Sequence, residues 1–210
     1  SHDSVPKCTH APAGVKANHV VAHGRETWTY TFGARPAVVG EALVPPDVLE
    51  QPMVAVTITP TWAAVAKAYV AAAAPRLAAA YPAELPHGDP LQTARAITAW
   101  VHHHVQYSGA AVGDDPIAPI DLDAVIKRGT GNAGELAALL VALLRGGGIS
   151  ADVVLVNRGG EHNVDRDVPA LTLFEGALVR ARIAGADVWI EPTESYEQVG
   201  QLPAYDQVRI

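Results

Sequence analysis

Polar and apolar residues follow two different periods along this chain, and the change between them falls near residue 60. Residues 26–32 alternate polar with aromatic side chains, which is the period of a half-buried strand. Residues 53–58 predict a second strand, closed by Pro60. Several prolines separate the two segments and indicate a long connection. We therefore expect strands and loops over residues 1–60.

Helical patterns begin at Thr61, which can cap a helix from Trp62 to Pro75 with a continuation to Tyr81. The alanines repeated along this stretch have high helix propensity. A second, amphipathic helix is predicted to begin at Pro90, with Asp89 as its N-cap, and to end near residues 107–109. Apolar residues recur at helical spacing from Leu91 to Val105.

The second half of the chain predicts further helices and then strands. A dense apolar helix is expected over residues 136–145, and the three glycines at 146–148 end it. The other segments with clear patterns are a helical turn at 122–127 and strands at 149–156, 171–183 and 187–190. Helices followed by strands are typical of the α+β class.

The composition argues against several kinds of partner and site. The formal net charge is −7, and no cluster of Lys or Arg is present to neutralise phosphates, so we expect no nucleic-acid partner. The most apolar stretch, residues 61–80, is interrupted by Lys67, Pro75 and Arg76, so it does not predict a membrane span. Cys8 is the single cysteine, which excludes an internal disulfide and an all-cysteine metal site.

An ordered set of segments in the second half carries a family resemblance. The segments are residues 94–107, 131–135, 139–149, 174–177 and 189–193. In order and spacing they resemble bacterial transglutaminase-like domains, which have the papain-type cysteine protease fold. Those domains place a helix before the nucleophile, then a Gly-Asp-Cys-Lys-Asp loop that opens a central helix, then strands reading Phe-Asn-His-Ala and Trp-Leu-Asp-Pro-Thr.

The resemblance implies an α+β core in which a central helix packs on an antiparallel sheet. It covers residues 61–210, and it makes residues 1–60 an N-terminal β and loop segment, the end of a β-rich domain that often precedes such cores. Domains of this family commonly occur in secreted or membrane-attached bacterial proteins, so the resemblance implies an extracytoplasmic setting. It implies no cofactor. Because Ser1 rather than Met begins the sequence, we expect a processed protein or a fragment.

The catalytic positions of the family do not carry catalytic residues here. In the family, a cysteine at the helix N-terminus is the nucleophile, a histidine is the base, and an acidic residue orients the histidine. The matching positions are Ala133, Gly176 and Glu191. A methyl group and a hydrogen cannot perform the first two roles. The resemblance therefore implies a catalytically inactive domain.

Three functions follow from a retained scaffold around such a site. The first is a protein- or peptide-binding module, for which the expected binding residues are Trp100, Tyr107, Asn132 and Trp189. The second is a structural module within a larger envelope or secreted protein. The alternative is an active cysteine protease, amidase or transglutaminase whose nucleophile was replaced by the engineered residue Ala133.

Other polar motifs favour structural roles. Side chains of successive helical residues project about 100° apart, so His102–His104 cannot converge on one ion, and we expect an exposed polar face with one partly buried imidazole and no metal. His162 is expected in a solvated loop. Glu135 lies in the first turn of the central helix, where capping is favoured over catalysis. Glu175 and Glu191 are not favoured as a glycosidase pair.

Overall fold

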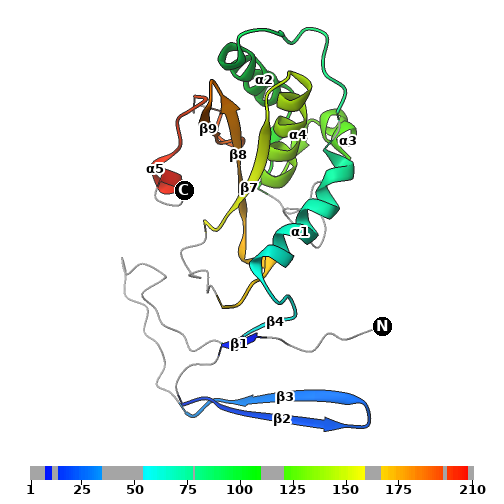
Figure 1. Ribbon diagram of the computed structural model, residues 1–210, viewed down its shortest axis with the longest axis vertical. Coiled ribbons are helices and arrows are strands. Elements are labelled where there is room, and N and C mark those ends of the chain that lie inside the picture. Colours follow the sequence, from blue (N-terminus) through cyan, green and yellow to red (C-terminus); the bar gives the residue numbers. More distant parts are fainter. Residues whose placement is uncertain are drawn as a thin grey trace. The chain divides into compact units, whose positions relative to one another are not determined.

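The computed structural model describes residues 8–10, 14–34, 54–77, 79–109, 121–158, 167–195 and 198–207 (Figure 1). His162 lies outside the described residues. The chain divides into two compact units, and each is described by itself. The first contains Ser1–Lys67 and Gly159–Leu173, and the second contains Ala68–Arg158 and Phe174–Ile210.

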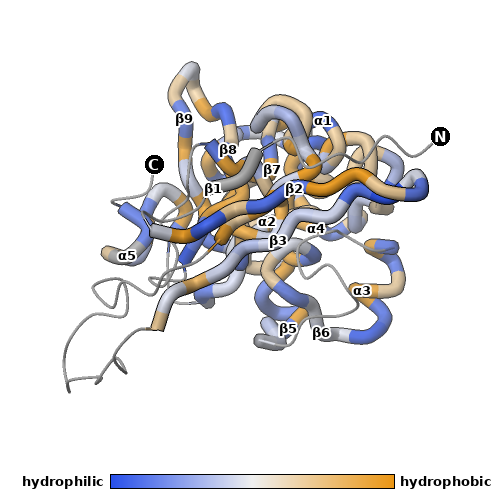
Figure 2. The backbone as a smooth tube through the Cα atoms, turned by 90° about the horizontal axis from the view of Figure 1, so that it is seen from below, coloured by the Kyte–Doolittle hydropathy of each residue, from blue (hydrophilic) through white to orange (hydrophobic). Residues whose placement is uncertain are grey.

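The first unit contains two pairs of antiparallel strands. β1 (Cys8–His10) pairs with β4 (Ala55–Thr57), and β2 (Lys16–Ala22) pairs with β3 (Arg25–Thr31). The β2–β3 turn has positive φ at both central residues, as two-residue hairpins of this kind require. The expected strands at 26–32 and 53–58 are thus confirmed. Apolar residues of β2 remain exposed (Figure 2).

Helix α1 (Trp62–Ala73) begins as expected, because the Thr61 hydroxyl accepts a hydrogen bond from the Ala64 amide at 3.1 Å. The expected continuation to Tyr81 is wrong. A 3₁₀ turn over Ala74–Arg76 follows, and residues 79–81 are not helical. Pro75 has no amide hydrogen and its ring obstructs the preceding turn, so the α-helix ends before it.

The helices of the second unit surround α4 (Ala133–Gly146), whose residues 133–144 are all buried. α2 (Pro90–His104) packs on α4, and α3 (Leu122–Arg128) lies beside its start. β5 (Gln106–Tyr107) and β6 (Thr130–Gly131) form a short parallel pair. α4 begins three residues earlier than expected, because a cap at Asn132 brings Ala133, Gly134 and Glu135 into the helix.

An antiparallel sheet of three strands covers another side of α4, so that α4 lies between α2 and the sheet (Figure 1). The strands are β7 (Ala151–Val156), β8 (Gly176–Ile183) and β9 (Ala186–Ile190), in that order. The strand expected from residue 171 begins only at 176, because Leu171–Leu173 form a 3₁₀ turn. A short helix, α5 (Ala204–Gln207), lies near the end of the chain.

The sheet separates two groups of apolar side chains. Alternate residues of β8 (Ala177, Val179 and Ala181) pack with α4 in the main core. Leu178 points to the other face, where it packs with Val156 and Leu202. A central helix on an antiparallel sheet is the α+β core that the sequence predicted. No helix among the described residues is long and apolar enough to cross a membrane.

Candidate functional site

The ends of three strands and the start of α4 lie at one end of the sheet. Residues 147–150 alone join α4 to β7, so β7 returns along α4 and finishes toward the start of that helix. Val156, the last residue of β7, pairs with Gly176, the first residue of β8. Glu191 directly follows the end of β9. This topology places Ala133, Gly176 and Glu191 toward the same end.

The start of α4 is stabilised by a reciprocal cap. The Asn132 side chain accepts from the Glu135 amide at 2.9 Å, and Glu135 Oε2 accepts from the Asn132 amide at 3.0 Å. Glu135 is fully buried, and Arg128 Nη2 donates to the same Oε2 at 2.8 Å. The expected capping role of Glu135 is confirmed. Ala133 follows the cap and presents only a buried methyl group.

Gly176 leaves a space that Arg158 occupies. A Cβ atom added to Gly176 would lie 2.9 Å from Val156 Cγ2 and 3.0 Å from both Cδ and Nε of Arg158. Real Cβ atoms essentially never approach a neighbour below 3.0 Å. Arg158 comes two residues after Val156 and reaches back over the glycine, so any side chain at position 176 would compete with the guanidinium for the same place.

The Arg158 guanidinium joins two buried carboxylates. Its Nη2 donates to Glu191 Oε2 and, at 2.8 Å, to Asp206 Oδ2, while its Nε donates to Asp206 Oδ1 at 3.2 Å. Both carboxylate side chains have no exposed surface, and the arginine side chain is 21% exposed. Glu191 Oε1 accepts from the amide and hydroxyl of Thr193 at 2.8 and 2.6 Å. We call Arg158, Glu191 and Asp206 the arginine corner.

The charges of the arginine corner do not balance when both carboxylates are ionised. One cation then faces two anions in a buried site, so one negative charge is in excess. Burial raises the pKa of Glu191, the Asp206 side chain adds to the rise, and the hydrogen bonds from Thr193 and the charge of Arg158 oppose it. A guanidinium has no acceptor atom and stays protonated, so Arg158 cannot act as a general base.

Arg158 and Asp206 were missed by the reasoning from sequence. Asp206 is 48 residues from Arg158, and no local pattern connects the two. A weak signal for Arg158 was present in its position just past a buried strand. That signal becomes informative only once the register places Val156 opposite Gly176, which the folded sheet alone reveals.

The expected binding residues fall into separate places. Trp100 stacks on His104 with ring centroids 4.0 Å apart, and its indole donates to Glu84 Oε1 at 2.8 Å. Tyr107 pairs with Gly131, which directly precedes Asn132, so these two expected residues come together at the start of α4. Tyr107 is 48% exposed. Trp189 lies elsewhere, packed against the group formed by Val156, Leu178 and Leu202.

The histidine run has the structure that its spacing predicts. His102 is partly buried and its Nε2 donates to the Pro192 carbonyl at 3.1 Å, while His103 and His104 are exposed. Burial lowers the pKa of His102, and the hydrogen bond to Pro192 partly opposes this. Across the described ranges, no group of three or more His, Cys, Asp or Glu side chains could hold a metal ion.

Comparisons with known proteins agree with this architecture. Residues 79–196 match the model of the transglutaminase-like superfamily. A crystal structure described as a putative protease from Parabacteroides distasonis superposes with a TM-score of 0.68 at 20% identity, over 92% of this chain and 39% of that one. At this identity the likeness shows the fold alone, and the chain spans about two fifths of that protein. No curated protein matches the chain.

Replacing Arg158 with Met should destabilise the protein strongly at neutral pH, by about 3–5 kcal/mol, because two buried carboxylates would lose their cation. Urea unfolding followed by circular dichroism measures the effect. The matched control is Arg182→Met, which removes an exposed pair with Asp187 and should change stability little. Equal losses from both substitutions would contradict a special role for the arginine corner.

Replacing Glu191 with Gln should change how stability depends on pH. Because the folded-state pKa of Glu191 lies above its ordinary 4.5, the folded protein keeps this proton to higher pH than the unfolded chain does. The stability that the protonated Glu191 contributes is complete below the ordinary pKa. It is lost as pH rises through the raised pKa of the folded protein. The unfolding free energy of the native protein minus that of E191Q should therefore fall with rising pH. If this difference rises with pH instead, the charge of Arg158 lowers the pKa of Glu191 more than burial raises it.

Proposed function

The chain belongs to the transglutaminase-like superfamily, and we propose that it is a catalytically inactive member that serves as a protein- or peptide-binding module. In this proposal Ala133 takes the position of the family's cysteine, Gly176 that of its histidine and Glu191 that of its acid. Superfamily members keep one fold while their sites change independently, so a retained core does not require a retained activity.

The arginine corner is the observation that carries the proposal of inactivity. A lost nucleophile alone is compatible with an engineered Ala133, because one substitution restores a thiol. Gly176 is different, since Arg158 fills the space beside it and is paired with Glu191. The acid that would orient a histidine is thus engaged by a cation that cannot accept a proton. This arrangement supports a site rebuilt for another purpose rather than one disabled by a single change.

The binding part of the proposal rests on the surface beside the start of α4. Tyr107 presents an aromatic ring that is 48% exposed, and its strand β5 is paired with β6 on one side. Aromatic side chains are enriched at protein interfaces because they bury a large area at a small cost in entropy.

We place the module in a larger extracytoplasmic protein of a bacterium. Fractionation of the source cells would test that setting, which a cytosolic location would exclude.

Restoring a thiol should not restore activity. In a Cys8→Ser background, Ala133→Cys supplies one thiol at the start of α4, yet no described imidazole is paired with Glu191 to activate it. We expect no amine incorporation into casein and no peptide hydrolysis above buffer, for either the native protein or the variant. Titration of the thiol after unfolding confirms that it is present. Turnover by the variant would instead support the alternative of an active enzyme with an engineered alanine.

A photo-crosslinking amino acid at position 107 should capture the partner. Benzoylphenylalanine is similar to tyrosine in size, so its introduction at this exposed site leaves the core intact. The control places the same group at Val70, which is 61% exposed on α1. We expect irradiation in an extract of the source cells to give a discrete crosslinked protein or peptide from position 107 and not from position 70. Identical products from both positions would argue against a binding surface at Tyr107.

A further inference from the structure

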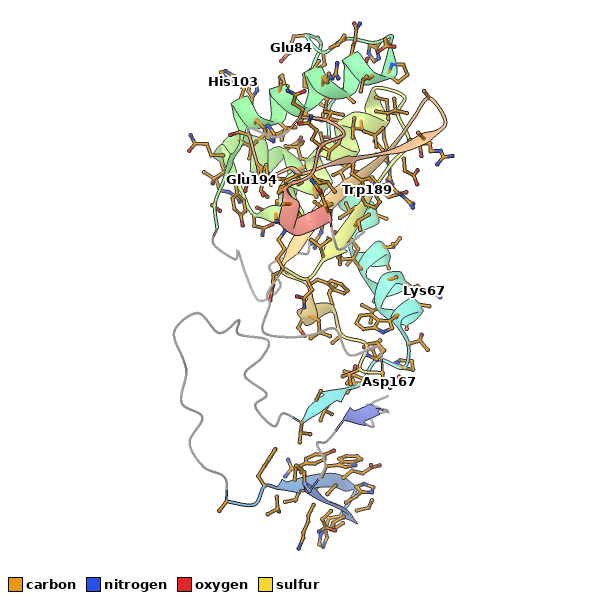
Figure 3. All side chains as sticks on the ribbon, turned by 90° about the vertical axis from the view of Figure 1, so that its left-hand side faces the viewer. Lys67, Glu84, His103, Asp167, Trp189 and Glu194 are labelled. Atoms are coloured by element: carbon orange, nitrogen blue, oxygen red, sulfur yellow. The ribbon has the colours of Figure 1, made fainter. Side chains whose placement is uncertain are left out.

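A pocket beside Trp189 has no part in the proposal above. Its volume is about 610 Å³, within the roughly 300–1,000 Å³ typical of small-molecule sites. Trp189, residues 200–204 and Gln207 line it, and Figure 3 shows the tryptophan next to α5. All of these residues belong to the second unit. We call this cavity the Trp189 pocket.

The walls of the Trp189 pocket are held in place by contacts made outside it. The Gly200 amide donates to the Trp189 carbonyl at 3.0 Å, and Gly200 has a φ of 91°, which favours glycine. Leu202 is buried with Val156 and Leu178. Asp206 in α5 is bound by Arg158, so the same guanidinium that fills the space beside Gly176 also fixes one wall. A site with pre-set walls loses less entropy when a ligand binds.

The polar groups around the Trp189 pocket are left available. The indole of Trp100 donates to a glutamate, but the indole of Trp189 makes no hydrogen bond to any described residue. The Gln201 carboxamide is exposed and equally uncommitted. Gln207 uses Nε2 to donate to the Leu202 carbonyl at 2.7 Å, and its Oε1 accepts no hydrogen bond from a described residue. Among the residues that the structure describes, no charged side chain lines the pocket.

We propose that the Trp189 pocket binds a neutral saccharide. A sugar ring presents a flat C–H face that can stack on an indole, and hydroxyl groups that both donate and accept. The Trp189 pocket offers the matching set, with a ring, an indole donor and two carboxamides. A charged ligand would find no counter-charge among the described lining residues. A purely apolar ligand would leave the indole N–H and the amides without water or a partner, which is unfavourable.

Isothermal titration calorimetry with the uncharged trisaccharide of N-acetylglucosamine tests the proposal on the full chain. We expect saturable binding, weakened about three- to tenfold by Gln201→Ala, which removes one hydrogen-bonding group from an exposed position. Trp189→Phe should weaken binding further, because it removes the indole donor and reduces the stacking area. The matched control is Gln92→Ala, an exposed glutamine on α2, which should leave affinity unchanged.

The outcomes separate the saccharide from other ligands. Absence of saturable binding by this probe and by the uncharged trisaccharide of glucose would overturn the proposal. So would unchanged affinity in Q201A, which tests the site even if the tryptophan variant fails to fold. Binding of an uncharged, end-blocked peptide in place of the sugars would assign the pocket to peptides instead. None of these results depends on catalytic activity or on the surface at Tyr107, so failure here leaves the proposed function standing.

Discussion

One partly buried arginine side chain holds together the end of the second unit where the strands meet. Arg158 follows β7, Glu191 follows β9 and Asp206 lies in α5, so a single side chain connects three segments that are far apart in sequence. Its hydrogen bonds with Asp206 are bidentate, which fixes orientation as well as distance. Without this cation the two carboxylates, neither of which has exposed surface, would repel each other. The covering of the sheet by the C-terminal residues and the wall of the Trp189 pocket both depend on it.

The start of α4 is stable for reasons that are independent of the arginine corner. Asn132 and Glu135 satisfy amides of the first turn for each other, and Arg128 balances the charge of the buried glutamate. The central helix therefore needs neither a nucleophile nor a base to begin at Ala133. The contacts that start the helix therefore do not involve the side chain of residue 133.

Local signals account for what could be predicted. Asp89 and Pro90 begin α2 as expected, since a cap and a preset φ act within a few residues. The alternation in β3 was equally clear. The predicted ends of elements were wrong where backbone geometry or pairing with a distant strand set the boundary. Pro75 ended α1 early. The strand expected from residue 171 was shortened because residues 171–173 turn before the register with β7 begins at Gly176.

The sequence by itself determined the family, the order of helices and strands, and the absence of a thiol and an imidazole at positions 133 and 176. These are properties of residue identity and short-range spacing. Only the tertiary structure decided which side chains surround these two positions. A hydrogen at Gly176 leaves room for many neighbours, and the choice of Arg158 follows from strand register and from two carboxylates brought close by folding. Electrostatic pairing of this kind depends on distance in space, which the order of residues does not contain.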